Sequence, residues 1–166
     1  MRTSILSVCL CLVLAGPGFA DTFVVRADGL GTYPDIQTAV DASVDGDQIW
    51  LIAGTFTGPG NRDIVIGRRN IVIRSFDNDP ATCIIDIGGS PAEPHRAFIS
   101  DDDACQTTAI AGITMKNGYG SGGGGAMLIV GYSSLYVTNC VFEDNATGMT
   151  DWHAGGAVYA LSLIHI

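Results

Sequence analysis

The chain has 166 residues, a formal net charge of −9 and a hydrophobic fraction of 47%. That hydrophobic content suffices for a packed core and excludes an intrinsically disordered chain. The acidic balance argues against nucleic acid or an anionic membrane surface as a partner. Twenty-two glycines and only 15% charged residues favour short elements joined by many turns.

Residues 1–20 have the pattern of a secretion signal. Arg2 supplies the positive start, residues 5–15 form an apolar run, and Gly18-Phe19-Ala20 is a small-x-small cleavage site. The apolar run is too short to span a bilayer. We therefore expect cleavage after Ala20 and a secreted protein, extracellular or at the cell surface, without a membrane span.

Residues 22–58 predict a strand, a glycine turn, an amphipathic helix, a second turn and another strand. The helix is expected over about residues 34–44, with Pro34 at its first position and Thr32 as its cap. Its buried face is predicted from apolar spacing, at Ile36, Ala39, Val40 and Ser43. Residues 48–53 are so continuously apolar that they predict a strand covered on both faces.

Six short motifs in this stretch form a known signature: Asp28-Gly29, Gly31-Thr32-Tyr33, Ile36-Gln37, Ala39-Val40, Gly46-Asp47 and Gly54-Thr55-Phe56. They resemble the amino-terminal cap of the right-handed parallel β-helix (pectin lyase-like) superfamily. The resemblance implies an all-β solenoid that begins with an amphipathic capping helix. Pectin methylesterases, many polysaccharide lyases and a group of secreted repeat proteins share this signature, so it indicates a fold rather than a reaction.

The rest of the chain alternates short apolar runs with glycine, proline and asparagine turns. The lack of crossover helices excludes a doubly wound α/β fold and leaves a β-sandwich or a solenoid. Residues 113–118 resemble residues 140–145, an offset of 27 (140 − 113), and residues 124–127 resemble 155–158, an offset of 31 (155 − 124). Offsets of this size match one solenoid coil. We therefore predict a solenoid over residues 21–160.

Three further features of these coils are open to interpretation. Asn139 and Asn145 are candidates for an amide ladder between coils or for ordinary turn chemistry. The glycine cluster 118–125 is predicted to be a flexible loop. Residues 161–166 resemble a non-native tail and residues 155–159 open a further coil, so we expect an amino-terminal fragment, truncated at its carboxy end, whose partners include downstream coils of its full-length chain.

Cysteines and acidic residues supply the candidate structural and metal sites. Cys83, Cys105 and Cys140 follow the signal, and either Cys83 and Cys105 form a disulfide or all three are small residues stacked inside the coil. Asp101, Asp102 and Asp103 form the candidate calcium site, with a solvated turn as the alternative. Calcium is the only cofactor considered. Arg68 and Arg69 are expected in a solvated turn.

The sequence assigns no catalytic residue. The glutamine and aspartate motifs of pectin methylesterases are missing from residues 122–131 and 138–145, and Asp144 and Asp151 lie in unrelated local sequence. Trp152 and His153 are the candidate carbohydrate contacts, with packing of Trp152 over the coil edge as the alternative.

Two functions follow as hypotheses. The first is a secreted or cell-surface scaffold, an adhesin-type repeat protein without catalytic activity in this fragment, with a polysaccharide or cell-surface partner and no nucleic acid. The second is the amino-terminal part of a carbohydrate-active enzyme, a polysaccharide lyase or pectin-esterase-like protein, whose catalytic coils lie further on.

Overall fold

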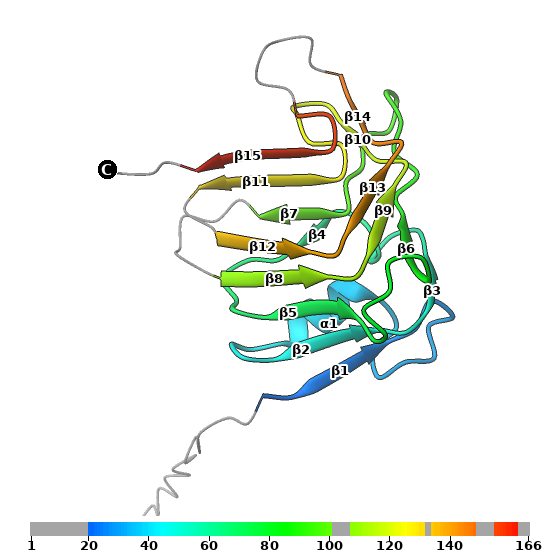
Figure 1. Cartoon of the computed structure of the whole chain (residues 1–166), viewed down its shortest axis with the longest axis vertical. Helices are drawn as coiled ribbons and strands as arrows, with labels where there is room; N and C mark the ends of the chain where they lie inside the picture. Colours follow the sequence, from blue (N-terminus) through cyan, green and yellow to red (C-terminus); the bar gives the residue numbers. More distant parts are fainter. Residues whose placement is uncertain (1–19, 101–106, 132–133, 149–154, 163–166) are drawn as a thin grey trace, which may run out of the picture.

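The computed structural model of the chain describes residues 20–100, 107–131, 134–148 and 155–162. Over these residues the chain forms a parallel β-solenoid of about 5 turns with one short helix, 43% strand and 6% helix (Figure 1). The predicted all-β solenoid with one helix near its amino terminus is therefore confirmed. The predicted domain boundaries and the truncation stay predictions.

Corresponding strands of successive turns stack into three parallel sheets. Sheet A contains β1 (Thr22–Val25), β2 (Gln48–Leu51), β5 (Val72–Ser75), β8 (Thr107–Ala111) and β12 (Ser134–Thr138). Sheet B contains β3 (Gly54–Phe56), β6 (Cys83–Asp86), β9 (Thr114–Lys116) and β13 (Val141–Glu143). Sheet C contains β4 (Ile64–Val65), β7 (Phe98–Ser100), β11 (Met127–Gly131) and β15 (Val158–Ser162). A smaller pair joins β10 (Tyr119–Gly120) to β14 (Ala146–Thr147).

Both internal repeats found in the sequence are coil-to-coil pairings. Thr114 lies beside Val141, which reproduces the offset of 27 residues (141 − 114). Met127 lies beside Val158, which reproduces the offset of 31 (158 − 127). Strand β15 continues this pairing to Ser162, so the first two residues of the predicted non-native tail extend a strand.

Inward-facing side chains form columns along the axis, one residue per turn. In sheet A the column is Phe23, Ile49, Ile73, Ile110 and Val137. Ile49, Ile73 and Ile110 are completely buried, whereas Val137 in the last turn is 36% exposed. Each turn is therefore buried by the turns next to it.

Helix α1 (Ile36–Ala42) packs against β1, β2 and β4 at the first turn of the stack. Its predicted face is confirmed, because Ile36, Ala39 and Val40 are completely buried and Ser43 nearly so. The predicted start is wrong. Asp35 is the N-cap, and its carboxylate accepts a hydrogen bond from Thr38 N at 2.7 Å. Pro34 therefore precedes the helix, and Thr32 N instead bonds to Val24 O at 2.7 Å.

Arg69 caps the other end of this helix rather than being solvated. Its Nε donates to Ser43 O at 3.2 Å, and its Nη2 lies 3.4 Å from Asp41 O. Its Nη1 donates to Ile66 O at 3.0 Å. An arginine here satisfies carbonyls that the helix leaves unpaired and complements the negative end of the helix dipole. Arg69 thus fastens the helix to the second turn.

Strand β2 is covered on only one face, which corrects the prediction from its apolar sequence. Ile49 and Leu51 point into the core, whereas Gln48 and Trp50 point outward and are half-buried. Tryptophan in an outward position looks the same in sequence as tryptophan in a strand with two covered faces. Trp50 therefore belongs to the surface described below.

Asparagine side chains bond to the backbone of other turns, and Asn139 also has the positive φ of 49° of a turn residue, so elements of both interpretations are present. Asn139 Nδ2 donates to Asn78 O at 2.6 Å. Asn145 accepts from Gly118 N at 2.8 Å and donates to Met115 O at 2.9 Å. Asn70 was not foreseen, but it bonds to both oxygens of Asp45 and accepts from Thr107 N. These bonds lower the pKa of the Asp45 carboxyl, chiefly through the backbone N–H of Asn70.

Within the glycine cluster 118–125, Gly118, Gly124 and Gly125 are packed against neighbouring backbone, so this part of the cluster is not a free loop. A Cβ on Gly118 would lie 2.1 Å from Gly125 O, and one on Gly125 would lie 2.4 Å from Ala146 O. Gly124 and Gly125 also donate to the carbonyls of Gly155 and Gly156 in the next turn. These glycines are required because neighbouring backbones leave no room for a side chain.

We predict that Gly118→Ala lowers the free energy of unfolding by about 2 kcal/mol or more, because the methyl group must displace backbone. Gly122 is the matched control, since nothing lies within 4 Å of its Cβ position. Urea unfolding should show Gly122→Ala within about 0.5 kcal/mol of the parent. Equal midpoints for the two variants would contradict the close packing.

Candidate functional site

Most candidate residues from the sequence lie outside the described residues. These are Asp101, Asp102, Asp103, Cys105, Trp152 and His153. The calcium site, the carbohydrate contacts and the disulfide therefore stay predictions. Among the described residues, no group of three or more histidine, cysteine, aspartate or glutamate side chains could hold a metal ion.

Cys83 and Cys140 occupy the same column of sheet B, with Ile113 between them. Cys83 is completely buried, Cys140 is half-buried, and no disulfide joins the two. Burial raises the pKa of the Cys83 thiol to about 12, with a smaller contribution from Cys140. Burial also raises the pKa of Cys140. Since the thiolate is the reactive form, both are poor nucleophiles, in keeping with stacked core residues.

We predict that Cys83 resists iodoacetamide at pH 8 in the folded chain and reacts after unfolding in urea. Mass spectrometry of the labelled peptides measures this. Two additional labels that require a reductant as well as urea would show the Cys83–Cys105 disulfide. Rapid labelling of Cys83 in the folded chain would refute its burial.

An aromatic and basic cluster lies on the outward face of sheet A. We call Trp50, Arg74 and Phe76 the sheet A cluster. The guanidinium carbon of Arg74 lies 5.2 Å from the Trp50 ring centroid, and the rings of Trp50 and Phe76 meet edge to face at 5.4 Å. Arg74 Nη2 also donates to Phe76 O at 2.9 Å. Trp50 Nε1 donates to Gln48 Oε1 at 3.0 Å, which fixes the indole ring.

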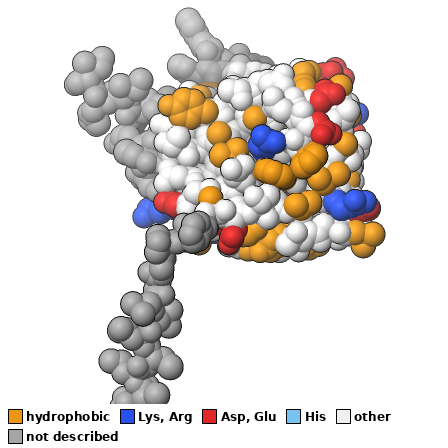
Figure 2. Space-filling model, turned by 60° about the horizontal axis from the view of Figure 1, so that its bottom comes forward, with side chains coloured by type: hydrophobic (Ala, Val, Ile, Leu, Met, Phe, Trp, Pro, Cys, Tyr) orange, Lys and Arg blue, Asp and Glu red, His pale blue; other side chains and the backbone are white. Residues whose placement is uncertain are grey.

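The next strands continue this face with small side chains and then another aromatic. Ala111 follows Arg74 in one outward column, and Ala109 is followed by Tyr136 in the other. Phe76 is 47% exposed and Tyr136 is 62% exposed. In the view of Figure 2, a basic side chain near the middle lies among hydrophobic ones, and the other acidic and basic side chains lie nearer the edges. The face therefore offers ring surfaces and a cation to a partner.

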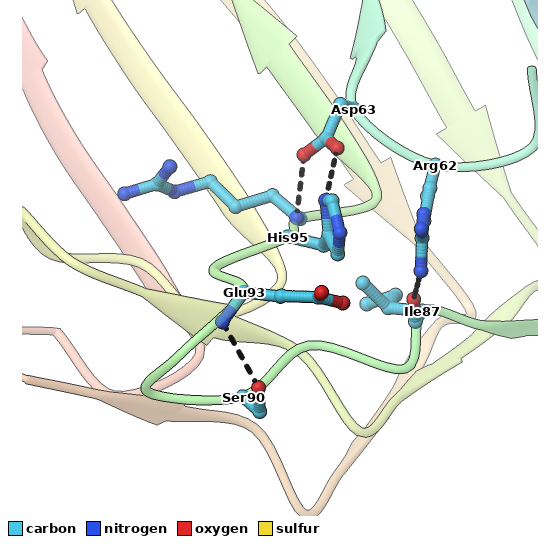
Figure 3. Close-up of polar contacts among 7 residues, drawn as sticks. Arg62, Asp63, Ile87, Ser90, Glu93 and His95 are labelled. Atoms are coloured by element: carbon cyan, nitrogen blue, oxygen red, sulfur yellow. Dashed lines mark hydrogen bonds and ion pairs between the residues drawn. The ribbon is translucent and has the colours of Figure 1, made fainter. Parts of the chain in front are cut away.

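A second polar cluster joins the turn before β4 to the turn before β7 (Figure 3). Asp63 Oδ2 lies 2.6 Å from His95 Nδ1, and Asp63 Oδ1 accepts from Arg96 N at 2.8 Å. Asp63 has a positive φ of 52°, a conformation that aspartate tolerates better than most residues. The Asp63 side chain is 39% exposed and the His95 side chain is 22% exposed. The carboxylate therefore holds the imidazole ring in one orientation.

Charged residues lie in the same turns as this Asp63–His95 dyad. Arg62 Nη1 donates to Ile87 O at 3.2 Å, and in Figure 3 the Arg62 side chain runs alongside His95 to Ile87. Arg96 donates to the carbonyls of Gly123 and Gly124 at 2.9 and 2.8 Å. An ionised carboxylate only accepts hydrogen bonds, so His95 Nδ1 carries a proton in this contact, and in the neutral form of the imidazole Nε2 then has a lone pair. Such an imidazole can accept or donate a proton.

Sequence reasoning assigned no role to this dyad. The two residues are 32 positions apart. Their proximity could have been predicted only from the pairing of the strands that follow them in sheet C, where Ile64 pairs with Phe98. That offset of 34 residues (98 − 64) differs from both repeats found in the sequence.

We predict that His95 is the Nδ1–H tautomer at pH 8 and that Asp63→Asn converts it to the Nε2–H tautomer. The amide nitrogen of asparagine would then donate to Nδ1, while asparagine still tolerates a positive φ. Two-bond ¹⁵N–¹H correlation spectra of the imidazole ring distinguish the tautomers. Identical ring shifts in the parent and the variant would contradict the contact.

Comparisons of the chain with protein-family models, with curated proteins and with solved structures found no match. The fold defines a class, the parallel β-solenoids, and the pectin lyase-like resemblance remains a prediction. In the part of the chain that the structure describes, no helix has the length and hydropathy of a bilayer span.

Proposed function

We propose that the chain is part of a secreted or cell-surface scaffold protein, a right-handed parallel β-helix of the pectin lyase-like kind. Its ligand is a polysaccharide or another cell-surface carbohydrate, which binds on the outward face of sheet A. The observation that carries this proposal is the sheet A cluster. Aromatic rings and a guanidinium group together suit the apolar faces and the hydroxyl groups of a sugar ring.

Arg74 provides a second argument for a ligand on this face. Among the described residues, its Nε is the buried side-chain polar atom without a hydrogen-bond partner. A buried donor left unpaired costs about 1–3 kcal/mol, so such groups call for an explanation. Ligand binding would give the Arg74 guanidinium a role beside the rings of Trp50 and Phe76.

The last described turn of sheet A leaves part of an inward column exposed. Val137 continues an inward column but is 36% exposed, whereas Ile110 one turn earlier is completely buried. This partly exposed column end is a surface on which a further strand in register could pack, as β12 packs on β8. Export through the signal at residues 1–20 completes the proposal.

A carbohydrate-active enzyme of the lyase or pectin-esterase-like kind is the second candidate. The observation that favours it is the Asp63–His95 dyad, since an oriented imidazole with a free Nε2 suits general acid–base chemistry. Loss of polysaccharide cleavage in His95→Ala, with unchanged polysaccharide binding, would support the enzyme. Unchanged turnover would exclude a catalytic role for the dyad.

The binding proposal is tested by affinity electrophoresis in gels that contain neutral or uronate-rich polysaccharides. The Phe76→Ala, Arg74→Gln double variant should bind about tenfold more weakly, because aromatic and cation–π contacts of about 0.5–1 kcal/mol each are removed. Val65→Ala is the matched control, since Val65 is 44% exposed in sheet C, outside the sheet A cluster. The proposal would be overturned if the polysaccharide slowed the migration of the parent chain, the double variant and Val65→Ala equally. It would also be overturned if no polysaccharide slowed the parent chain.

A further inference from the structure

The carboxylate of Asp47 is buried beside the first strand of the solenoid. Asp47 is only 2% exposed. Its Oδ2 accepts from Val44 N at 2.8 Å, and its Oδ1 accepts from Asp21 N at 2.9 Å. Among the described residues, no lysine, arginine or histidine forms an ion pair with it. A buried carboxylate is costly unless a positive charge or several donors compensate it.

The backbone of Asp21 is held in place beside this carboxylate. Gln48 N donates to Asp21 O at 2.9 Å, and the next residue, Thr22, pairs with Gln48 in sheet A. Val72 N in turn donates to Asp47 O at 3.1 Å. The nitrogen of Asp21 therefore points at Asp47 because two neighbouring strands fix both residues.

We propose that Asp47 is the binding site for the new amino terminus that export creates. The inference rests on the proposed function, which places signal cleavage at the Ala20–Asp21 bond. Water hydrolyses that bond under the catalysis of a signal peptidase. The C–N bond breaks, the carbonyl carbon of Ala20 takes the oxygen and becomes a carboxylate, and the nitrogen of Asp21 becomes an α-ammonium group.

Cleavage thereby converts a neutral donor into a charged one at the same position. The ammonium keeps its hydrogen bond to Asp47 Oδ1 and adds the opposite charge that the buried carboxylate lacks. Its other protons reach water, since Asp21 is exposed. Strand β1 forms one edge of sheet A, and terminal strands open easily unless they are tied down. The mature protein would therefore hold its first strand more firmly than the precursor does.

The test compares chains with defined amino termini. One chain begins at Asp21, and the other carries Ser-Gly-Ala before Asp21, so its Asp21 nitrogen stays an amide. Each is made with Asp47 and with Asp47→Asn. We expect the unfolding equilibrium constant of the chain that begins at Asp21 to be about tenfold smaller than that of the extended chain, and this advantage to vanish with Asp47→Asn. Equal stabilities, or an advantage that survives Asp47→Asn, would overturn the proposal.

Amine acylation provides a second readout that needs no variant. Lys116 is the single lysine of the chain, so a chain that begins at Asp21 has two amines. The native α-amine should acylate about tenfold more slowly than in urea, because pairing with the Asp47 carboxylate favours the ammonium form over the free amine that reacts. Lys116, whose Nζ lies 3.4 Å from Asp86 Oδ2 and whose side chain is 31% exposed, shows in the same sample how far a partly exposed ion pair slows the reagent. An α-amine as reactive in the folded chain as in urea would refute the pairing.

Export itself is tested separately. The full chain is expressed with its signal, and the intact mass of the secreted product gives its first residue. A product that begins elsewhere, or no product outside the cell, contradicts the export part of the proposed function. The stability comparison tests the pairing of Asp21 with Asp47 whatever that result.

Discussion

The stacking of equivalent positions at the spacing of adjacent strands is the constraint on which the rest of this structure depends. Strands in a parallel sheet lie about 4.8 Å apart, so a side chain that points inward meets its counterpart in the next turn. Ile49, Ile73 and Ile110 satisfy this requirement in one column, and Phe56, Ile85 and Met115 satisfy it in another. No turn has a core of its own. The outward positions do not have to fill the core, and Trp50, Arg74 and Tyr136 occupy such positions.

Local sequence predicted the elements well where a single physical rule decides them. The apolar face of α1 and the two coil offsets depend on periodicity, which the residues display directly. The helix start was misjudged because Thr32 and Asp35 are both good caps, and only packing selects between them. The glycine cluster was misjudged because glycine serves an open loop and a tight backbone contact equally well, and the contact involves another turn.

The polar clusters were beyond sequence reasoning because the coils differ in length. Along sheet A, Gln48 pairs with Val72 after 24 residues (72 − 48), and Val72 pairs with Ala109 after 37 (109 − 72). No fixed period therefore brings Asp63 to His95, Arg69 to the end of α1 or Asp47 to Asp21. Each of these contacts depends on how its own turn pairs with the next one, and that pairing cannot be calculated from a fixed period. From sequence alone, a charged residue in a turn is expected to face water.

These unequal coils have a consequence for how such a protein can change. Between Val72 and Ala109 the chain takes thirteen more residues (37 − 24) than between Gln48 and Val72, yet the strands on either side pair in the same way. Doubling a loop adds only about 0.6 kcal/mol of closure entropy, so the corners can lengthen without much effect on the interior. Insertions and deletions at the corners would then remodel the outer contour while the stack inside keeps its pitch. Diversity in such an architecture is carried by length as much as by residue identity.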